Sequence, residues 1–437
     1  MTATVVGGGL AGCEAAFALA ERGVDVTLFE MRPARSTPAH RTDRLAEIVC
    51  SNTFKSVEVT NAHGLLKAEL RRLGSLLLRI ADRSRVPGGA ALTVDREAFS
   101  EAVTATIADH PRISVVREEV TAISTPAVVA TGPLTSDALA ETIAARIGVE
   151  RLAFYDAIAP IVSDDSLAHD RLYRLSRYGK GEGDDFLNVP LSREEYGAFL
   201  DLLLAADRHV GHDFDAVPYF EGCLPIEEMA RRGRETLRFG PLKPVGLPDP
   251  RTGREPHAVV QLRREDRAGQ MWNLVGFQTR LRIPEQQQVF RALPGLEGAE
   301  FFRYGSIHRN TYLNTPAALV PPLTLADDPR VFFAGQLVGV EGYTESLGTG
   351  LLAGINLARA LAGEAPQLPP PETMLGGLLA YVHGCDPAHF QPMNANFGLL
   401  PPLDRTVRDK RRKRELLAER ALAATEAFVT ELGIGPS

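Results

Sequence analysis

The chain opens with an apolar run that leads straight into closely spaced glycines, Thr4-Val5-Val6-Gly7-Gly8-Gly9-Leu10-Ala11-Gly12. Residues Thr4 to Gly7 predict a short buried strand, Ala11 to Arg22 predict a helix, and Val24 to Glu30 predict a second strand. This segment therefore predicts a complete β-α-β unit, with the glycines at the turn between the first strand and the helix.

The spacing of the glycines predicts a dinucleotide site at this turn. Gly7, Gly9 and Gly12 suit a tight turn, a close approach of the backbone to a pyrophosphate, and packing of the helix on the strand. The N-terminus of the helix then faces the phosphates. Glu30 ends the second strand, where a carboxylate can accept hydrogen bonds from a ribose diol. The predicted cofactor-binding residues of this segment are Gly7, Gly8, Gly9, Leu10, Ala11, Gly12 and Glu30.

Two later segments favour FAD over NAD as the dinucleotide. Ala130-Thr131-Gly132 and Phe333-Ala334-Gly335-Gln336 resemble the segments that flank the flavin in glutathione-reductase-like flavoproteins, and NAD-binding folds have no such pair. That resemblance implies backbone contacts with the ribityl and pyrophosphate groups, a tyrosine near the ring, and a helix starting within 348–354. The residues it implies are Gly335, Gln336, Glu341, Gly342 and Tyr343.

Composition limits the class of protein. The chain has 437 residues, 44% of them apolar and 24% charged, with a net charge of -7, which is typical of a globular protein of two or three domains. No apolar run is long enough for a membrane span and no secretory signal is evident, so a cytoplasmic protein is expected. The acidic balance argues against indiscriminate nucleic-acid binding, although 405–414 is strongly basic. Neither DNA nor a membrane is expected as a partner.

Residues 61–77 predict a further helix, and residues 113–116, 127–130 and 331–334 predict further short strands. The order of predicted elements indicates an α/β fold with a Rossmann-type FAD-binding domain of the glutathione-reductase-like kind and an inserted smaller α+β domain. Residues 1–150 and 301–437 are expected to form the discontinuous FAD-binding domain, which ends in a basic helix from Arg405 to Leu432. Residues 151–300 lose the β-α-β rhythm and are expected to form the inserted domain.

Four cysteines occur, without the C-x-x-C spacing of a zinc site or a redox pair, so no metal site is predicted. Cys50 lies near Lys55, and a cation favours the thiolate. Cys223 lies just before Pro225, a residue that suits the first turn of a helix, and a helix N-terminus lowers the pKa of a thiol. Each of the two cysteines, taken alone, is also compatible with a purely structural role as a small buried apolar residue.

Further segments, spread along nearly the whole chain, are not general flavoprotein signatures. They include Cys50-Ser51-Asn52-Thr53-Phe54-Lys55, Gly64-Leu65-Leu66-Lys67-Ala68-Glu69, Tyr155-Asp156-Ala157-Ile158-Ala159-Pro160, Ser176-Arg177-Tyr178-Gly179-Lys180-Gly181, Gly222-Cys223-Leu224-Pro225, Thr236-Leu237-Arg238-Phe239-Gly240-Pro241, Asn273-Leu274-Val275-Gly276-Phe277 and His308-Arg309-Asn310-Thr311-Tyr312. With them the chain resembles the folate- and FAD-dependent tRNA (uracil-5-)-methyltransferases.

The resemblance implies methylation of C5 of the T-loop uridine in tRNA, with methylenetetrahydrofolate as carbon donor and NAD(P)H re-reducing the flavin. The chemistry requires a thiolate, because C5 of uracil becomes nucleophilic only after a thiolate adds to C6. A base must then remove the C5 proton and the methylene must accept a hydride. Cys223 is assigned as the C6 nucleophile and Cys50 as the base or methylene-handling thiol, although the reverse division stays open.

Two groups of residues are candidates for substrate contacts. His308 and Arg309 fit either folate binding or an ordinary polar loop. Cations in 405–414 can track the phosphates of tRNA or form a solvated helix end. The candidates in the basic group are Lys410, Arg411, Arg412, Lys413 and Arg414.

Three other functions are compatible with parts of this pattern. A wobble-uridine-modifying tRNA flavoenzyme shares the cofactors but is expected to be longer. A flavin or thiol oxidoreductase would need a C-x-x-C pair and a second nucleotide motif. A non-catalytic flavin-containing RNA-binding protein would use the basic segment alone. The sequence leaves the oligomeric state undetermined.

Overall fold

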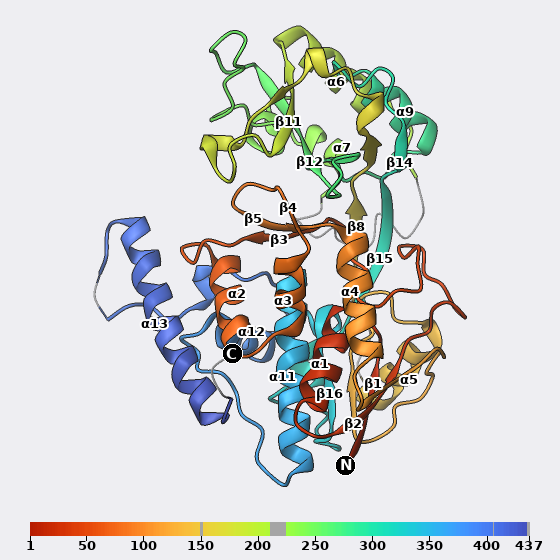
Figure 1. Ribbon diagram of the computed structural model, residues 1–437, viewed down its shortest axis with the longest axis vertical. Coiled ribbons are helices and arrows are strands. Elements are labelled where there is room, and N and C mark those ends of the chain that lie inside the picture. The colour runs from red at the N-terminus through yellow and green to blue at the C-terminus, as the bar shows by residue number, and fades with distance from the viewer. Residues whose placement is uncertain (149–151, 210–223, 405, 435–437) are drawn as a thin grey trace.

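The computed structural model describes residues 1–148, 152–209, 224–404 and 406–434, without the side chains of 152–156 and 307–309. The chain folds into two parts, one above the other along the long axis, and a long helix projects from the side of the lower part (Figure 1). No helix within the described ranges is long and apolar enough to cross a membrane.

A five-stranded parallel sheet forms the centre of the lower part. The strands lie in the order β16-β7-β1-β2-β6, and every neighbouring pair is parallel. This arrangement confirms the predicted α/β fold and the N-terminal β-α-β unit. The elements concerned are β1 (Thr2–Val6), α1 (Leu10–Ala20), β2 (Asp25–Phe29), β6 (Ile113–Val116), β7 (Ala127–Val129) and β16 (Val331–Phe333).

Helix α11 (Tyr343–Leu361) packs directly on α1, beside which it runs in Figure 1. Glycines allow this close approach, because a Cβ at Gly350 would lie 2.2 Å from the Ala11 carbonyl oxygen and one at Gly354 would lie 2.6 Å from that of Ala15. The contact brings residues far apart in sequence into one apolar core, which runs from the first strand to the last helix.

The structure corrects three predicted helix boundaries. The helix expected to start within 348–354 already starts at Tyr343, after Gly342 with a φ of 120°. The helix predicted over 61–77 is two helices, α2 (Ala62–Arg72) and α3 (Leu76–Arg83), because Gly74 turns the chain with a φ of 87°. The final helix, α13 (Lys410–Glu431), starts later than predicted because the Asp409 side chain caps it.

The upper part is built on a six-stranded antiparallel sheet, in the order β10-β11-β12-β13-β9-β14. It has its own apolar core around the buried Trp272. Its main elements are β9 (Ile161–Ser163), β10 (Tyr173–Arg174), β11 (Phe186–Leu191), α6 (Arg193–Ala205), α7 (Ile226–Arg231), α8 (Thr236–Phe239), β12 (Ala258–Arg264), β13 (Met271–Leu274), α9 (Ile283–Arg291) and β14 (Phe301–Arg303).

Two antiparallel strands, β8 (Leu152–Ile158) and β15 (Ser306–Tyr312), connect the two parts. The two separate cores support an inserted unit between these strands. The boundaries at 150 and 300 stay a proposal. The upper part is called the inserted unit below.

Candidate functional site

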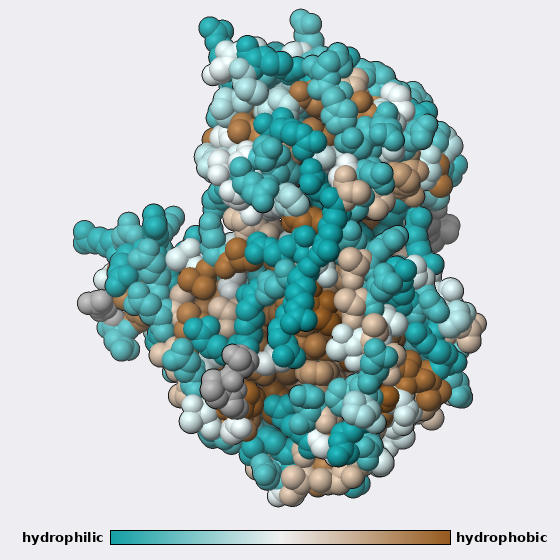
Figure 2. Space-filling model, viewed as in Figure 1, coloured by the Kyte–Doolittle hydropathy of each residue, from teal (hydrophilic) through white to brown (hydrophobic). Residues whose placement is uncertain are grey.

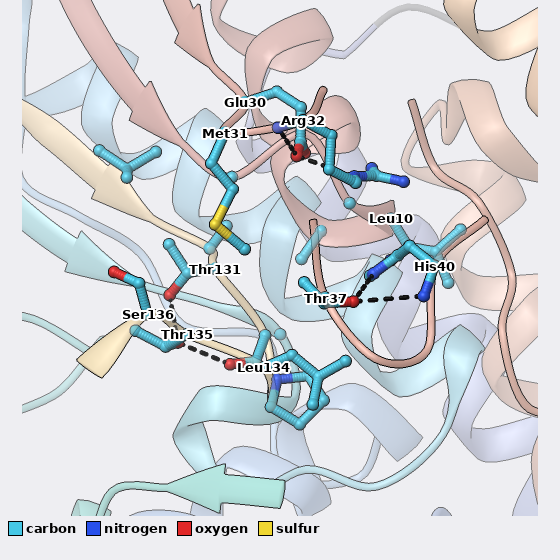
Figure 3. Close-up of a pocket in the computed structure, with 18 of the residues that line it drawn as sticks. Leu10, Glu30, Met31, Arg32, Thr37, His40, Thr131, Leu134, Thr135 and Ser136 are labelled. Carbon is cyan, nitrogen blue, oxygen red and sulfur yellow. Dashed lines mark hydrogen bonds and ion pairs between the residues drawn. The ribbon is translucent and has the colours of Figure 1, made fainter. Parts of the chain in front are cut away.

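A cavity lies at the carboxyl ends of the parallel strands, where the glycine turn joins β1 to α1 (Figure 3). Predicted residues from all three cofactor segments line this glycine-turn cavity. Thr37 and His40, whose side chains are 2.7 Å apart, also line this cavity. The predicted residues among its lining are Gly7, Gly9, Leu10, Ala11, Glu30, Ala130, Thr131, Gly132, Gly335, Gln336 and Tyr343.

The three motif glycines differ in what surrounds them. Gly7 has a φ of 104°, and a Cβ at Gly12 would lie 1.8 Å from the Gly7 carbonyl oxygen, so these two glycines form the turn and the helix contact. A Cβ at Gly9 would meet no atom within 4 Å. No side chain in the described part of the chain caps the N-terminus of α1. Free backbone donors beside open space suit an anionic group such as a pyrophosphate.

The predicted ribose ligand, Glu30, also supports the turn itself. Its carboxylate accepts hydrogen bonds from the Gly8 backbone N–H at 3.0 Å and from the Arg32 backbone and Nε at 3.0 and 2.9 Å. Burial alone would raise the pKa of Glu30, but the Arg32 hydrogen bonds and charge and the Gly8 N–H hold it below its usual value. Glu30 is therefore an anion that fixes the glycine turn and lines the cavity.

A second cavity, the Cys50 cavity, adjoins the first and lies between the two parts of the chain. It shares Val49, Pro133, Leu134, Gln336 and Tyr343 with the glycine-turn cavity. A group bound in one cavity can therefore reach the other. Besides Gln336 and Tyr343, the polar side chains around it are Cys50, Ser51, Thr53, Lys55, Arg263, Asn273, Gln278, Asn310, Glu341 and Asn394.

Tyr343 stands at the boundary of the two cavities and holds the segment that carries Cys50. Its phenolic oxygen accepts hydrogen bonds from the backbone N–H groups of Cys50 and Ser51 at 3.0 and 3.1 Å. Its ring meets that of Phe54 edge to face, with the centroids 5.5 Å apart. Burial raises the pKa of Tyr343, so the phenol stays protonated.

Arginines that the sequence analysis missed surround the Cys50 segment. Arg96 donates to the carbonyls of Ile48 and Cys50 at 2.8 and 3.3 Å and pairs with Glu265 at 2.5 Å. Arg263 donates to Asn52 at 2.9 Å, and burial lowers its pKa. Lys55, the cation predicted near the thiol, lines the same cavity. Cys50 thus lies in a cationic environment built from both parts of the chain.

Replacing Arg96 with methionine is expected to lower the free energy of unfolding by about 3 kcal/mol, because it leaves the buried Glu265 carboxylate without its main partner. Urea unfolding measures the change. Arg35→Met is the matched control, since Arg35 pairs with Glu119 at the same 2.5 Å but is exposed, and should change stability little. If the two substitutions lower the free energy of unfolding by the same amount, the ion pair of Arg96 with Glu265 does not stabilise the fold.

A buried polar network supports the Cys50 segment from behind. The Lys67 Nζ donates to the carbonyls of Phe54 and His63 at 2.6 and 2.8 Å. His63 lies 3.1 Å from the carboxylate of Glu345, in the first turn of α11. Burial lowers the pKa of Lys67 to about 7. These residues fix β3 (Thr53–Ser56), which directly follows the Cys50 turn.

The remaining flavin-segment residues lie close together. The Gly335 N–H donates to Thr349 at 2.8 Å, and Gln336 donates to the Glu341 carboxylate. Gln336, Glu341 and Gly342 line the Cys50 cavity, whereas Gly8 and Gly12, also predicted to bind the cofactor, line neither cavity. Cofactor binding by these residues stays a prediction.

The second candidate thiol, Cys223, lies outside the described residues. Three residues later, the Ile226 N–H donates to the Gln278 carbonyl at 2.7 Å, and Gln278 lines the Cys50 cavity. His308 and Arg309 lie on β15, but their side chains are outside the described part. Their neighbour Asn310 lines the same cavity.

The basic candidates, 410–414, form the first turns of α13 and are exposed. Arg411 and Arg412 each pair with Glu415, at 3.2 and 3.1 Å. Figure 2 shows the projecting helix covered mainly with hydrophilic residues. The position suits contact with a large polyanion, although acidic residues of the same helix offset part of its charge.

Comparisons with known proteins agree on one family. Residues 2–365 match the family model described as glucose inhibited division protein A. A methylenetetrahydrofolate–tRNA-(uracil-5-)-methyltransferase TrmFO of Geobacter sulfurreducens is 61% identical over 98% of this chain and 98% of its own length. A TrmFO of Desulforudis audaxviator is 55% identical over 99% of both.

Among solved structures, GidA of Aquifex aeolicus has a TM-score of 0.70 at 17% identity, and the match covers 99% of this chain and 73% of that chain. At this identity the similarity shows the shared fold alone.

Proposed function

Because the chain belongs to the methylenetetrahydrofolate–tRNA-(uracil-5-)-methyltransferase family TrmFO, we propose that it methylates C5 of the T-loop uridine in tRNA. Methylenetetrahydrofolate is the carbon donor and NAD(P)H the final reductant. We also propose that the reaction takes place in the cytoplasm.

The observation that carries the proposal is the junction of the two cavities at Gln336 and Tyr343. One cavity has the open glycine turn and uncapped helix that fit the pyrophosphate of FAD. The other contains the Cys50 thiol among cations. Reductive methylation requires a redox cofactor and a thiol in reach of one substrate base.

FAD would be held by the glycine turn and Glu30 at one end and by the Gly335 to Tyr343 segment at the other. When bound and reduced, it supplies the electrons that turn a transferred methylene into a methyl group. Tyr343, at the boundary, keeps the Cys50 segment at a fixed position beside the cofactor site.

The thiols act on the uracil. Addition of a thiolate forms a bond from sulfur to C6 and moves the C5–C6 electron pair onto C5 and O4, so that C5 can attack the carbon donor. A base then removes the C5 proton as the bond from the transferred carbon to the folate nitrogen breaks, which releases tetrahydrofolate and leaves a methylene on C5. Addition of a hydride to this methylene, with reduced FAD as the electron source, would form the methyl group as the sulfur–C6 bond breaks and the ring is restored. We assign the C6 attack to Cys223 and the proton or methylene step to Cys50.

Substrate contacts are proposed at two places. His308 and Arg309 would bind folate, supported by Asn310, which follows them on β15 and lines the Cys50 cavity. Lys410 to Arg414 would contact phosphates of tRNA, where cations release counterions and make binding depend on salt.

The test combines the purified protein, an unmodified tRNA transcript, NADPH and methylenetetrahydrofolate with a labelled methylene. Mass spectrometry of the nucleosides is expected to find the label in 5-methyluridine. A transcript with cytidine at the T-loop target is the matched control and should stay unlabelled. Label at the wobble uridine would favour the related modifying enzyme, and no label in any nucleoside would refute the proposed function.

A further inference from the structure

Two aromatic side chains of the inserted unit are unusually exposed. Tyr178 is 65% exposed in the turn after β10, and Phe239 is 81% exposed at the end of α8. Burying rings of this size in a core is strongly favourable, so large exposed aromatics often mark a binding surface. Neither ring lines one of the two cavities described above.

The structure holds the Tyr178 ring in a fixed position. Tyr178 has a φ of 59°, in the left-handed region that residues with a side chain rarely adopt. Its N–H donates to the Gly246 carbonyl at 3.2 Å. The ring lies so close to Gly246 that a Cβ there would be 2.5 Å from it. Strained backbone of this kind persists only where the surroundings hold it, and it is common at ligand sites.

One loop, residues 240–246, connects the two aromatics: it follows Phe239 and packs against the turn that carries Tyr178. Phe239 is followed by a turn in which the Leu242 N–H donates to the Leu237 carbonyl at 2.9 Å. Arg177, the neighbour of Tyr178, donates to the Lys243 carbonyl in this loop at 2.8 Å. The aromatic surface, as it is called below, consists of Tyr178, Phe239, Lys243 and Val245, all of them exposed.

The aromatic surface adjoins the Cys50 cavity. Pro241 packs on Gly276, where a Cβ would be only 2.4 Å from the proline ring, and Gly276 lines that cavity. On the other side, Lys180 pairs with Glu58 at 2.7 Å, just beyond β3. The loop after Phe239 therefore contacts the lining of the Cys50 cavity, and the turn that carries Tyr178 contacts the lower part of the chain near β3.

We propose that the aromatic surface binds the tRNA substrate by stacking unpaired bases on Tyr178 and Phe239; this inference rests on the proposed function. Chemistry at C5 and C6 requires the target uridine to leave its stack, which deprives its neighbours of a stacking partner. Aromatic side chains replace such partners in RNA recognition.

Two lysines at or beside this surface can contact a phosphate backbone, although the exposed Glu182 and Asp184 follow Lys180 closely. Lys243 is exposed and makes no ion pair with any residue that the structure describes. Lys180 can exchange Glu58 for a phosphate, because both partners are about half exposed. One acidic group is already engaged, since Glu255 accepts the Gly246 N–H at 2.7 Å.

The test measures binding of a fluorescent T-arm stem-loop RNA by anisotropy at fixed salt. Tyr178→Ala and Phe239→Ala are each expected to weaken binding about tenfold, which corresponds to about 1.4 kcal/mol, and the double variant about a hundredfold. Tyr178→Phe and Phe239→Tyr keep the rings and should bind as the wild type does. Flavin absorbance and circular dichroism check that each variant is folded.

Phe302→Ala is the matched control. Phe302 is 53% exposed, but it lies on β14, at the opposite edge of the sheet from β10. Its loss should leave RNA binding unchanged.

Three outcomes would overturn the inference. If the wild type methylates the RNA and the double variant binds it with the same affinity, RNA binding by the aromatic surface is refuted and the proposed function stays intact. A wild type that neither binds nor methylates the RNA would refute both. If the wild type sediments as a dimer and the double variant as a monomer, with the same RNA affinity, the aromatic surface binds a second copy of the chain instead.

Discussion

Cys50→Ala is expected to slow tRNA methylation at least about a thousandfold, because removal of a thiol that acts on the reacting atoms typically costs this much or more. The variant should still bind flavin and RNA. The Cys50 side chain makes no hydrogen bond with the described residues, and the hydrogen bonds from Cys50 to Tyr343 and from Arg96 to Cys50 use the backbone of Cys50. Labelled-methylene transfer, measured by nucleoside mass spectrometry, gives the rate.

Cys385→Ala is the matched control for the loss of a thiol. Cys385 is free and half-buried like Cys50, but it follows α12 (Met374–Gly384) and lines neither cavity. Its loss should leave the rate unchanged. A Cys50→Ala variant that keeps more than about a tenth of the wild-type rate would refute a chemical role for Cys50.

A second assay, which detects a covalent protein–RNA adduct, can show which of the two thiols attacks C6. RNA with 5-fluorouridine at the target position cannot lose its C5 substituent as a proton, so a protein–RNA adduct through C6 persists. If Cys223 attacks C6, Cys50→Ala keeps the ability to form the adduct and Cys223→Ala loses it. The opposite pattern would assign the C6 attack to Cys50.

The sequence predicted the elements that depend on local patterns. Apolar runs at 113–116, 127–130 and 331–334 each became a strand of the parallel sheet, within one residue of the expected ends. Helix ends were less predictable. Helix α11 starts after Gly342, which has a φ of 120° and where a Cβ would lie 2.3 Å from the Glu345 carboxylate. A small-residue segment gives no local sign of this conformation.

The site was predictable only in part, because its contacts join distant residues. Cys50 and Lys55 stood out through their own sequence setting. Tyr343 is 293 residues from Cys50, Arg263 is 211 from Asn52, and Arg96 is 46 from Cys50. No periodicity or motif connects such pairs, so the arginines around the thiol and the buried Lys67 became visible only in the folded chain.

Gly9→Leu is expected to give a folded but colourless protein with at least about a hundredfold weaker FAD binding, a loss of about 2.8 kcal/mol. The backbone of Gly9, with φ -80° and ψ -169°, suits any residue, and a Cβ there meets nothing within 4 Å. The leucine side chain would therefore fit the fold but fill the space proposed for the pyrophosphate. Flavin absorbance after purification and titration with FAD measure the effect.

Two further changes at the same turn separate cofactor binding from folding. Gly9→Ala adds only a Cβ in open space and should reduce FAD affinity far less than leucine does. Gly12→Ala places a Cβ 1.8 Å from the Gly7 carbonyl oxygen, so it should destabilise the turn itself and lower the yield of folded protein. A Gly9→Leu protein that purifies with a full complement of flavin would show that the pyrophosphate binds elsewhere. The glycine turn would then be a structural feature of α1 and β1 only.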